Sequence, residues 1–199
     1  MLFHVGQLYS RGKDIHDRFG GSRQSGISPS ASHPLIFLFT GDTGDRYGYA
    51  DGWSEGVFLY SGEGQRGDMQ FVRGNKAVRD HVRDGKDLHL FTAQGKGQPY
   101  RYDGPFICSG WHEGEGDDAD GKTRKTIIFH LVGLEDAMDA PPINEASGHG
   151  EAHLNELRQR AIASSTSASE EAPGEGFRNI YSRSAAVRDY VLARAAGQC

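Results

Sequence analysis

Aromatic, acidic and glycine residues are concentrated between Tyr47 and Trp53, a combination that could bind a flat ring. The stretch holds three aromatic residues, one acid and two glycines, and a second aromatic–serine pair follows one apolar run later. Aromatic side chains on neighbouring elements can stack on both faces of a base, and an acid between them can accept a hydrogen bond from an amino group. The pattern predicts a pocket for an extruded base, with an ordered loop that binds nothing as the alternative. The candidate residues are Tyr49, Asp51, Trp53, Tyr60 and Ser61.

Other motifs in the chain do not support competing chemistries. Residues 62–67 match G-x-G-x-x-G, but no crossover helix of a βαβ unit opens there. The nine histidines show neither H-E-x-x-H nor Cys/His knuckle spacing, and no G-x-S-x-G elbow is present. His89 and His130 lie in apolar runs, where a structural role is more common than metal ligation. We therefore expect no dinucleotide site, metal site or serine-hydrolase site in residues 1–135.

The elements that must position the pocket are mostly strands. Short apolar runs alternate with Gly/Asp turns, and 23 of the 28 glycines fall in the first 135 residues. One internal helix is expected, capped by Asn75 and ended by Gly85, with Val78 and Val82 on one face. Several strands around one short helix predict an α+β fold with a curved or barrel-like sheet. The expected strands include residues 35–39, 57–60, 88–91, 106–108 and 126–132.

Charge and composition limit the partners. The 199-residue chain has a net charge of −5, no apolar run of membrane-spanning length and no signal-like N-terminus. Residues 1–135 hold 16 basic and 18 acidic residues, and five of those acids lie within residues 113–120, so the rest of this region is net basic by three. A local basic face is therefore possible for nucleic acid. Two cysteines, Cys108 and Cys199, favour a reducing cytoplasm, and the lack of a long apolar run favours no membrane association.

The composition changes near residue 135. Residues 140–142 read Ala-Pro-Pro, and residues 164–176 are rich in Ser, Glu and Ala, which is typical of a flexible linker. Helices are expected at 153–163 and from Ser184, a candidate N-cap, to Arg194. We therefore divide the chain into a β-rich domain, residues 1–135, and a helical and flexible linker, residues 136–199.

The residues in the β-rich part resemble the SRA (YDG) domain family. The namesake tripeptide stands at 102–104, and residues 48–64 are similar to the family's aromatic–acid turn, strand and Tyr-Thr-Gly-x-Gly segment in unbroken register. The likeness covers residues 3–135. It implies a PUA-like β-barrel that binds duplex DNA and flips a modified cytosine out of the helix.

The resemblance also implies roles for individual residues. Tyr49 and Tyr60 would stack on the base, Asp51 would accept from its amino group, and Ser61 or backbone near Gly62 would add a second contact. Arg23 or Gln24, in the loop 18–25, would fill the gap left by the base. The expected DNA-groove and backbone contacts are Arg18, Ser22, Arg23, Gln24, Arg73, Lys76 and Arg79, the last three having a solvated helix face as the alternative.

Two departures from the family pattern stand out. The second acid of the usual aromatic-x-Asp-Asp turn is replaced by Gly52, and residues 65–74 are all that occupies the space of the long finger found in many eukaryotic members. The finger's Asn-Lys-Arg triplet is absent, so a preference for hemimethylated CpG is not expected. The choice between 5-methyl- and 5-hydroxymethylcytosine depends on the pocket volume around C5 and is left open.

Residues 15–21, 36–41, 62–69 and 84–91 carry a stronger similarity. They resemble strings found in actinobacterial modification-dependent restriction endonucleases, in which an SRA-like domain precedes an HNH nuclease. In that group, the last helix leads to a Cys-x-x-Cys zinc knuckle, whose first ligand would be Cys199. The resemblance implies that this chain is a non-catalytic reader without a cofactor, and that zinc and a divalent metal belong to the HNH module. It is compatible with a homodimer. The alternative function is a small-ligand or protein-binding barrel without DNA.

Overall fold

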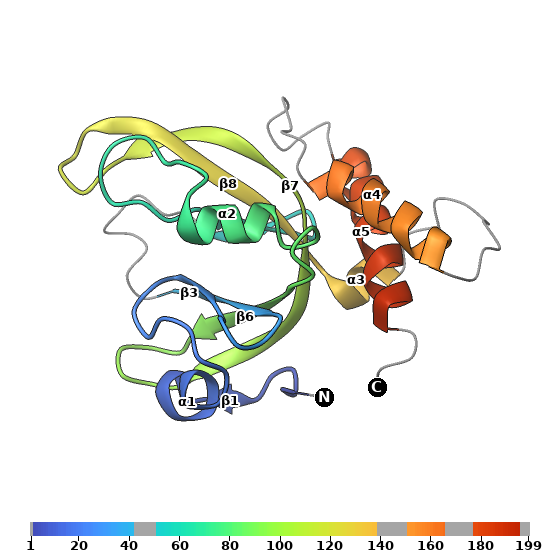
Figure 1. The fold of residues 1–199 in the computed structure, drawn as a ribbon. Coiled ribbons are helices and arrows are strands. Elements are labelled where there is room, and N and C mark those ends of the chain that lie inside the picture. Colours follow the sequence, from blue (N-terminus) through green and yellow to red (C-terminus); the bar gives the residue numbers. More distant parts are fainter. Residues whose placement is uncertain (1, 42–50, 139–150, 166–176, 196–199) are drawn as a thin grey trace.

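The computed structural model describes residues 2–41, 51–138, 151–165 and 177–195. It shows a mixed α+β fold, as the sequence predicts (Figure 1). The strands are β1 (Leu8–Tyr9), β2 (Ile27–Pro29), β3 (Leu35–Thr40), β4 (Gly52–Ser54), β5 (Val57–Ser61), β6 (Asp87–Ala93), β7 (Tyr100–Asp117) and β8 (Thr123–Gly133). The helices are η1 (Arg11–His16, a short π-helix), α1 (Asp17–Phe19), α2 (Arg73–Arg79), α3 (Leu134–Met138), α4 (Glu151–Ser165) and α5 (Phe177–Ala195).

The eight strands form one curved sheet. Its order is β2-β3-β6-β7-β8-β5-β4, with β1 added to β7. All neighbours are antiparallel except β3 and β6, which run parallel. The end strands β2 and β4 are not paired with each other, so the described strands form an open sheet. The expected α+β fold with a curved, barrel-like sheet is confirmed, although the sheet does not close. All five apolar runs identified in the sequence lie within strands.

The concave side of the sheet holds the main core. Alternate residues of β7 and β8 point inward, among them Cys108, Phe129 and Leu131, and Val78 of α2 packs against them. A register shift between Cys108 and Gly110 marks a β-bulge in β7. Helix α2 therefore lies over this core in Figure 1. Hydrogen bonds join its residues Gly74 and Asn75 to Glu63, just after the end of β5.

The internal helix differs from the prediction at its start. Helix α2 is capped at Val72 and not at Asn75, which lies inside the helix and is buried. The Asn75 side chain accepts from Glu63 N at 2.7 Å and donates to Glu63 O at 2.8 Å and to Gln70 O at 2.9 Å. The capping prediction is wrong because the Asn75 amide forms its hydrogen bonds with Glu63 and Gln70, and not with the free backbone N–H groups at the start of α2.

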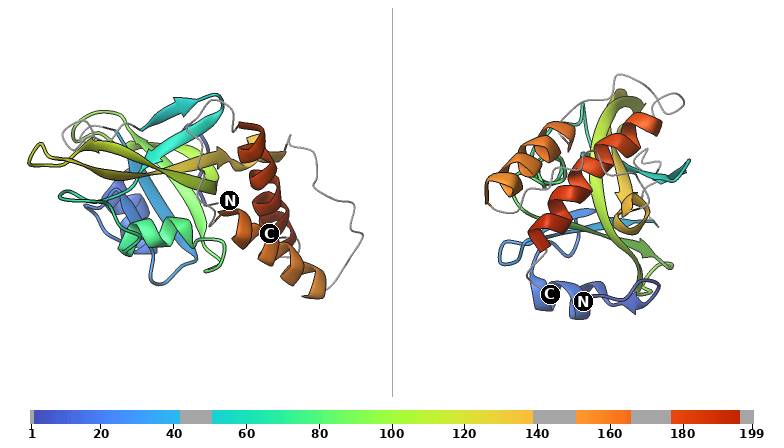
Figure 2. Two further views of the ribbon diagram at one scale, coloured as in Figure 1. Left: turned by 90° about the horizontal axis from the view of Figure 1, so that it is seen from above. Right: turned by 90° about the vertical axis from the view of Figure 1, so that its right-hand side faces the viewer.

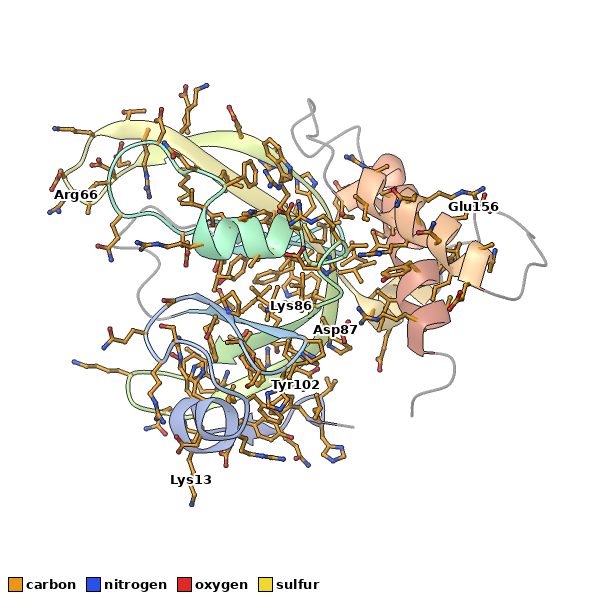
Figure 3. The ribbon with its side chains drawn as sticks, viewed as in Figure 1. Lys13, Arg66, Lys86, Asp87, Tyr102 and Glu156 are labelled. Atoms are coloured by element: carbon orange, nitrogen blue, oxygen red, sulfur yellow. The ribbon has the colours of Figure 1, made fainter. Side chains whose placement is uncertain are left out.

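A second, aromatic cluster lies on the other face of β3 and β6. Phe3, Phe37, Phe91 and Tyr102 pack together beneath η1 and α1, mostly edge to face. Tyr102 belongs to the namesake tripeptide, and its hydroxyl lies 2.7 Å from His89 Nδ1. Figure 3 labels Tyr102 in this lower part of the molecule. The tripeptide therefore stabilises the fold, and its middle residue, Asp103, accepts from Arg101 Nε at 2.8 Å.

Helices α4 and α5 pack side by side on the convex face of the sheet (Figure 2). Val187 and Tyr190 of α5 and Ala161 of α4 contact Ile107 of β7 and Val132 of β8 in one apolar cluster. The two expected helices are therefore present, but α5 begins at residue 177, so Ser184 is a buried residue within it and not its N-cap.

Polar contacts strengthen the same interface. Arg194 of α5 pairs with Asp87, which Figure 3 shows at the boundary between the sheet and the helices. Arg158 of α4 donates to the Arg83 carbonyl at 2.7 Å. Among the described segments, no helix has the length and apolar character needed to cross a membrane.

Candidate functional site

A cleft opens where β3 and β5 end, between the loop before β2, the loop after β5 and the start of α2. Its volume is about 1260 Å³. Five glycines, three serines and one alanine form much of its wall, and Asp51, Glu63 and Arg73 are its charged residues. The full lining is Ser22, Gln24, Ser25, Gly26, Ile27, Pro29, Phe39, Thr40, Gly41, Asp51, Tyr60, Ser61, Gly62, Glu63, Gly64, Gln65, Val72, Arg73, Gly74 and Ala77.

Asp51 is held in a fixed orientation in this cleft. Its Oδ2 accepts from Thr40 Oγ1 at 2.6 Å, and its Oδ1 accepts from Ser61 N at 2.7 Å. Burial raises the pKa of Asp51 above its usual value, and the hydrogen bonds from Thr40 and Ser61 partly offset that rise. Each carboxylate oxygen can accept more than one hydrogen bond. The structure thus presents an acceptor that is oriented before any ligand binds.

Tyr60 and Ser61 are the last two residues of β5, and Ser61 is hydrogen-bonded to Asp51. Tyr60 is only 2% exposed, and its hydroxyl donates to Phe39 O at 3.2 Å. Burial raises the pKa of Tyr60 well above its usual value, with the charges of Asp51 and Glu63 adding to the effect, so the phenol stays neutral. Ser61 is 8% exposed, and its Oγ is buried without a hydrogen bond among the described residues. A buried polar atom left without a partner is uncommon and costs stability.

Glu63 is a cleft residue that the sequence analysis missed. Its Oε1 accepts from Gly74 N at 2.9 Å, joining the loop after β5 to the start of α2. Burial raises the pKa of Glu63, whereas the Gly74 hydrogen bond and the Arg73 charge lower it. A Cβ at Gly74 would lie 2.7 Å from Glu63 Oε1 and from Ile27 Cβ, so only glycine fits there. The Gly-x-Gly pattern at 62–64 was the available signal.

The first residue of α2 is strained. Arg73 has a φ of 46°, in the left-handed region that non-glycine residues rarely adopt. Such a conformation costs on the order of 1 kcal/mol and persists where the surrounding structure enforces it. Val72, directly before it, is extended and 54% exposed although it is apolar. Both residues line the cleft.

Arg11 fixes the loop that carries the predicted groove residues. Its guanidinium lies 3.8 Å from the centre of the Phe39 ring and donates to Ser22 O at 3.2 Å and to Ser25 O at 2.5 Å. The loop therefore has a defined path along the cleft. The sequence analysis placed Arg11 in no site, because its contacts to the loop depend on the fold.

The predicted site residues are only partly brought together. Asp51, Tyr60, Ser61, Ser22, Gln24 and Arg73 line the cleft. Tyr49 and Cys199 lie outside the described residues. Trp53 does not line the cleft, because the pairing of β4 with β5 places it against Phe58 and Phe106, where it stays 59% exposed.

Four basic residues that were predicted to contact DNA also do not line the cleft. Arg23 is paired with Asp17 on the surface, and Arg18 lies 5.0 Å from the centre of the Phe19 ring. Arg79 pairs with Asp80 at 2.8 Å. Lys76 is exposed on α2, next in sequence to the lining residue Ala77.

No cluster of three or more His, Cys, Asp or Glu residues that could hold a metal ion occurs in the described parts of the chain. The cleft itself is lined by hydrogen-bonding groups and a few charged residues. Asp51 offers a fixed acceptor, Ser61 a free hydroxyl, and Arg73 a positive charge at the edge.

Comparison with protein families identifies this architecture. The family model described as "ScoMcrA-like, SRA domain" matches residues 5–146, more than half of the chain. The chain belongs to this SRA domain family. The matched region contains the cleft and the whole curved sheet, whereas α4 and α5 lie beyond it. No curated protein sequence matches the chain.

Solved structures share the SRA fold. The sulfur-binding and SRA domains of ScoMcrA complexed with phosphorothioated DNA match with a TM-score of 0.55 and 19% identity, over 85% of this chain and 47% of that chain. The Type IV phosphorothioation-dependent restriction endonuclease ScoMcrA matches with a TM-score of 0.52 and 17% identity, over 81% and 35%. The SUVH5 SRA–methylated CHH DNA complex matches with a TM-score of 0.45 and 21% identity, over 65% and 88%. This SRA chain thus spans less than half the length of the two ScoMcrA chains.

Proposed function

We propose that this SRA chain binds duplex DNA and turns a modified cytosine into the cleft, as the recognition part of a modification-dependent restriction endonuclease. The observation that carries the proposal is Asp51, a partly buried carboxylate fixed by Thr40 and Ser61 in the cleft of an SRA domain. The nuclease activity, with its zinc and divalent metal, belongs to a separate HNH module. The DNA reader itself needs no cofactor.

Asp51 distinguishes cytosine from thymine in this scheme. Cytosine carries an exocyclic amino donor where thymine carries a carbonyl acceptor, so a carboxylate binds the first and repels the second. The free Ser61 hydroxyl donates to an acceptor on the same edge of cytosine and thereby gains the partner it lacks. The two groups are adjacent, because Asp51 already accepts from the Ser61 backbone.

The walls of the cleft suit a flat ring. Tyr60 is held rigid by its hydrogen bond to Phe39, and its neutral aromatic ring lines the cleft. Tyr49, which lies outside the described residues, is the second stacking residue in this proposal. Base–aromatic stacking contributes about 1–3 kcal/mol per base, which offsets part of the cost of extruding it.

Contacts to the DNA backbone come from the edges of the cleft. Arg73 is positioned at the start of α2, Ser22 and Gln24 lie on the loop fixed by Arg11, and Lys76 is exposed nearby. Contacts to phosphate set the register of the protein on DNA and make binding dependent on salt, but they carry no sequence information. Selectivity for the modified base therefore resides in the cleft.

A competition assay tests this function. Matched duplexes carry cytosine, 5-methylcytosine, 5-hydroxymethylcytosine or thymine at one position, and the wild type is expected to bind the modified duplexes more tightly. Asp51→Asn keeps the shape and can still accept from Ser61 N, but it loses the charge-assisted bond to the base. In this variant, we expect the ratio of affinities for the modified and the plain duplex to be about ten- to a hundred-fold lower than in the wild type.

Lys76→Ala is the matched control. Because Lys76 contacts only phosphate, this variant is expected to weaken binding to all duplexes equally and to reduce the salt slope by about one. Equal affinity of the wild type for plain and modified duplexes would refute the proposed function. Binding that is insensitive to salt would point instead to a barrel that binds a small ligand or a protein.

A further inference from the structure

One exposed apolar side chain lies in the cleft. The large hydrophobic residues that are exposed in the described parts of the chain are Leu2, Val5, Leu8, Trp53, Val72 and Leu192. Of these, Val72 alone lines the cleft. An apolar side chain held in water at the edge of a polar cleft gains free energy when a ligand covers it, and it is suited to meet an apolar surface on that ligand.

The segment that carries Val72 is fixed on the sheet. Met69 N donates to Lys125 O at 2.9 Å, and Arg124 Nη1 donates to Gly64 O at 2.6 Å. Phe71 packs against Trp111 with ring centres 4.5 Å apart, and Arg79 lies 4.7 Å from the centre of the Phe71 ring. These contacts hold both sides of Val72, so its exposure does not come from a loose loop.

The strained backbone at Arg73 explains why the Val72 side chain is exposed at the edge of the cleft. The backbone is extended at Val72, turns sharply at the left-handed Arg73 and then enters α2. The short chain between Phe71, which is packed, and Asn75, which is buried, cannot relax this turn without losing their contacts. Strain maintained at the edge of a binding cleft is a common feature of functional sites.

We infer that Val72 is the wedge that enters the base stack when a nucleotide is turned into the cleft. This inference rests on the proposed function. An extruded base leaves a gap between two apolar base faces, and apolar side chains are the usual wedges between base steps. The residues expected in this role from the sequence fit less well, because Gln24 is polar and Arg23 is paired with Asp17.

The experiment uses three duplexes that separate the wedge from the pocket. The first carries 5-methylcytosine, the second carries unmodified cytosine, and the third has an abasic site at that position, which provides a gap but no base. Val72→Ala should bind the first and third about ten-fold more weakly than the wild type, and the second with unchanged affinity. Val5→Ala is the matched control, because Val5 is also 54% exposed and does not line the cleft.

The Asp51→Asn variant distinguishes this inference from the proposed function. It should weaken binding to the 5-methylcytosine duplex and leave binding to the abasic duplex unchanged, since no base is present to be read. A loss of affinity in Val72→Ala that is equal for all three duplexes, or absent for all three, would overturn the wedge. Equal wild-type affinity for the first two duplexes, with the abasic effect of Val72→Ala retained, would refute the reader and leave the wedge standing.

Discussion

The cleft and the face covered by α4 and α5 lie on opposite sides of the same sheet, and they are built from different residues. Small residues and charged groups line the cleft, where Ser61 Oγ lacks a partner among the described residues and Arg73 is strained. The other face is an apolar cluster around Val187 and Tyr190, closed by the pair of Arg194 with Asp87. The difference indicates that the helix-covered face supplies stability, whereas the cleft keeps costly features for binding.

The two regions also respond to pH in opposite directions. Burial lowers the pKa of His81, beside the helix-covered face, to about 4, so its neutral form is favoured in the fold. Burial raises the pKa of Asp51 and Glu63 in the cleft, so their neutral forms are favoured too. Acid therefore destabilises the helix-covered face, whereas neutral pH carries a cost in the cleft.

The largest effect is expected from Tyr190→Ala. Tyr190 is buried between α5 and the sheet, and removing a large aromatic side chain from such a site costs about 3 kcal/mol or more. Denaturant unfolding should show this loss of free energy. The ratio of affinities for modified and plain duplexes, measured on folded protein, should stay constant; a changed ratio would mean that the two regions are not separable.

The next effect concerns acid sensitivity. The ordinary pKa of His81 is 6.5 and the pKa in the fold is about 4, so stability is lost as pH falls between these values, on the order of 3 kcal/mol. His81 accepts from Cys108 N at 3.2 Å, and Gln can replace that acceptor. The free energy of unfolding of His81→Gln should therefore fall less from pH 7 to pH 4 than that of the wild type. Parallel pH profiles would contradict the assignment.

Arg73→Gly is expected to have smaller effects, which differ between stability and DNA affinity. Glycine adopts the left-handed φ of this position without strain, so the free energy of unfolding should be unchanged or higher by up to about 1 kcal/mol. DNA affinity should fall, and the salt slope should decrease by about one because a phosphate contact is lost. Arg160→Ala, an exposed cation on α4, is the control for a general change in charge. Lower stability together with full affinity would show that Arg73 is structural.

The smallest effect is expected from Glu63→Gln. Because the pKa of Glu63 is raised in the fold, the unfolded chain releases the proton first, and the wild type loses stability as pH rises past the ordinary value of 4.5. Gln can still accept from Gly74 N. Thermal unfolding at pH 4 and pH 7 should show the stability of the variant rising relative to the wild type between the two. A relative fall would mean that the pKa of Glu63 is lowered, and not raised, by folding.

The sequence predicted the strands well and their partners poorly. Residues 35–39 form a strand because five consecutive apolar residues are suited to a strand buried on both faces. Their parallel pairing with β6 joins residues about 50 positions apart, and no local pattern encodes it. Asn75 was misassigned as a cap for the same reason, since the groups that its side chain binds are set by the tertiary fold.

The cleft was predictable only where residues are adjacent in sequence. The step from Asp51 to Tyr60 and Ser61 follows from one hairpin, and these residues do line one cleft. Trp53 was included with them because it stands two positions from Asp51, but strand pairing carries it away. Glu63 and Val72 were missed because their roles depend on where α2 packs, which neither composition nor spacing expresses.

The bulge at Ser109 has a consequence for how this gene can change. On β7, Phe106 and Cys108 contribute to the inner core and Ile107 to the outer cluster; after the extra residue, Trp111 again packs against the inner core and His112 reaches His130 outside. Side chains alternate along a strand, so one codon lost here would exchange the two faces of every later residue in the hairpin. Point substitutions at this position should be tolerated far more readily than a one-codon deletion. Homologues should therefore conserve the number of residues in this segment more strictly than the residue types.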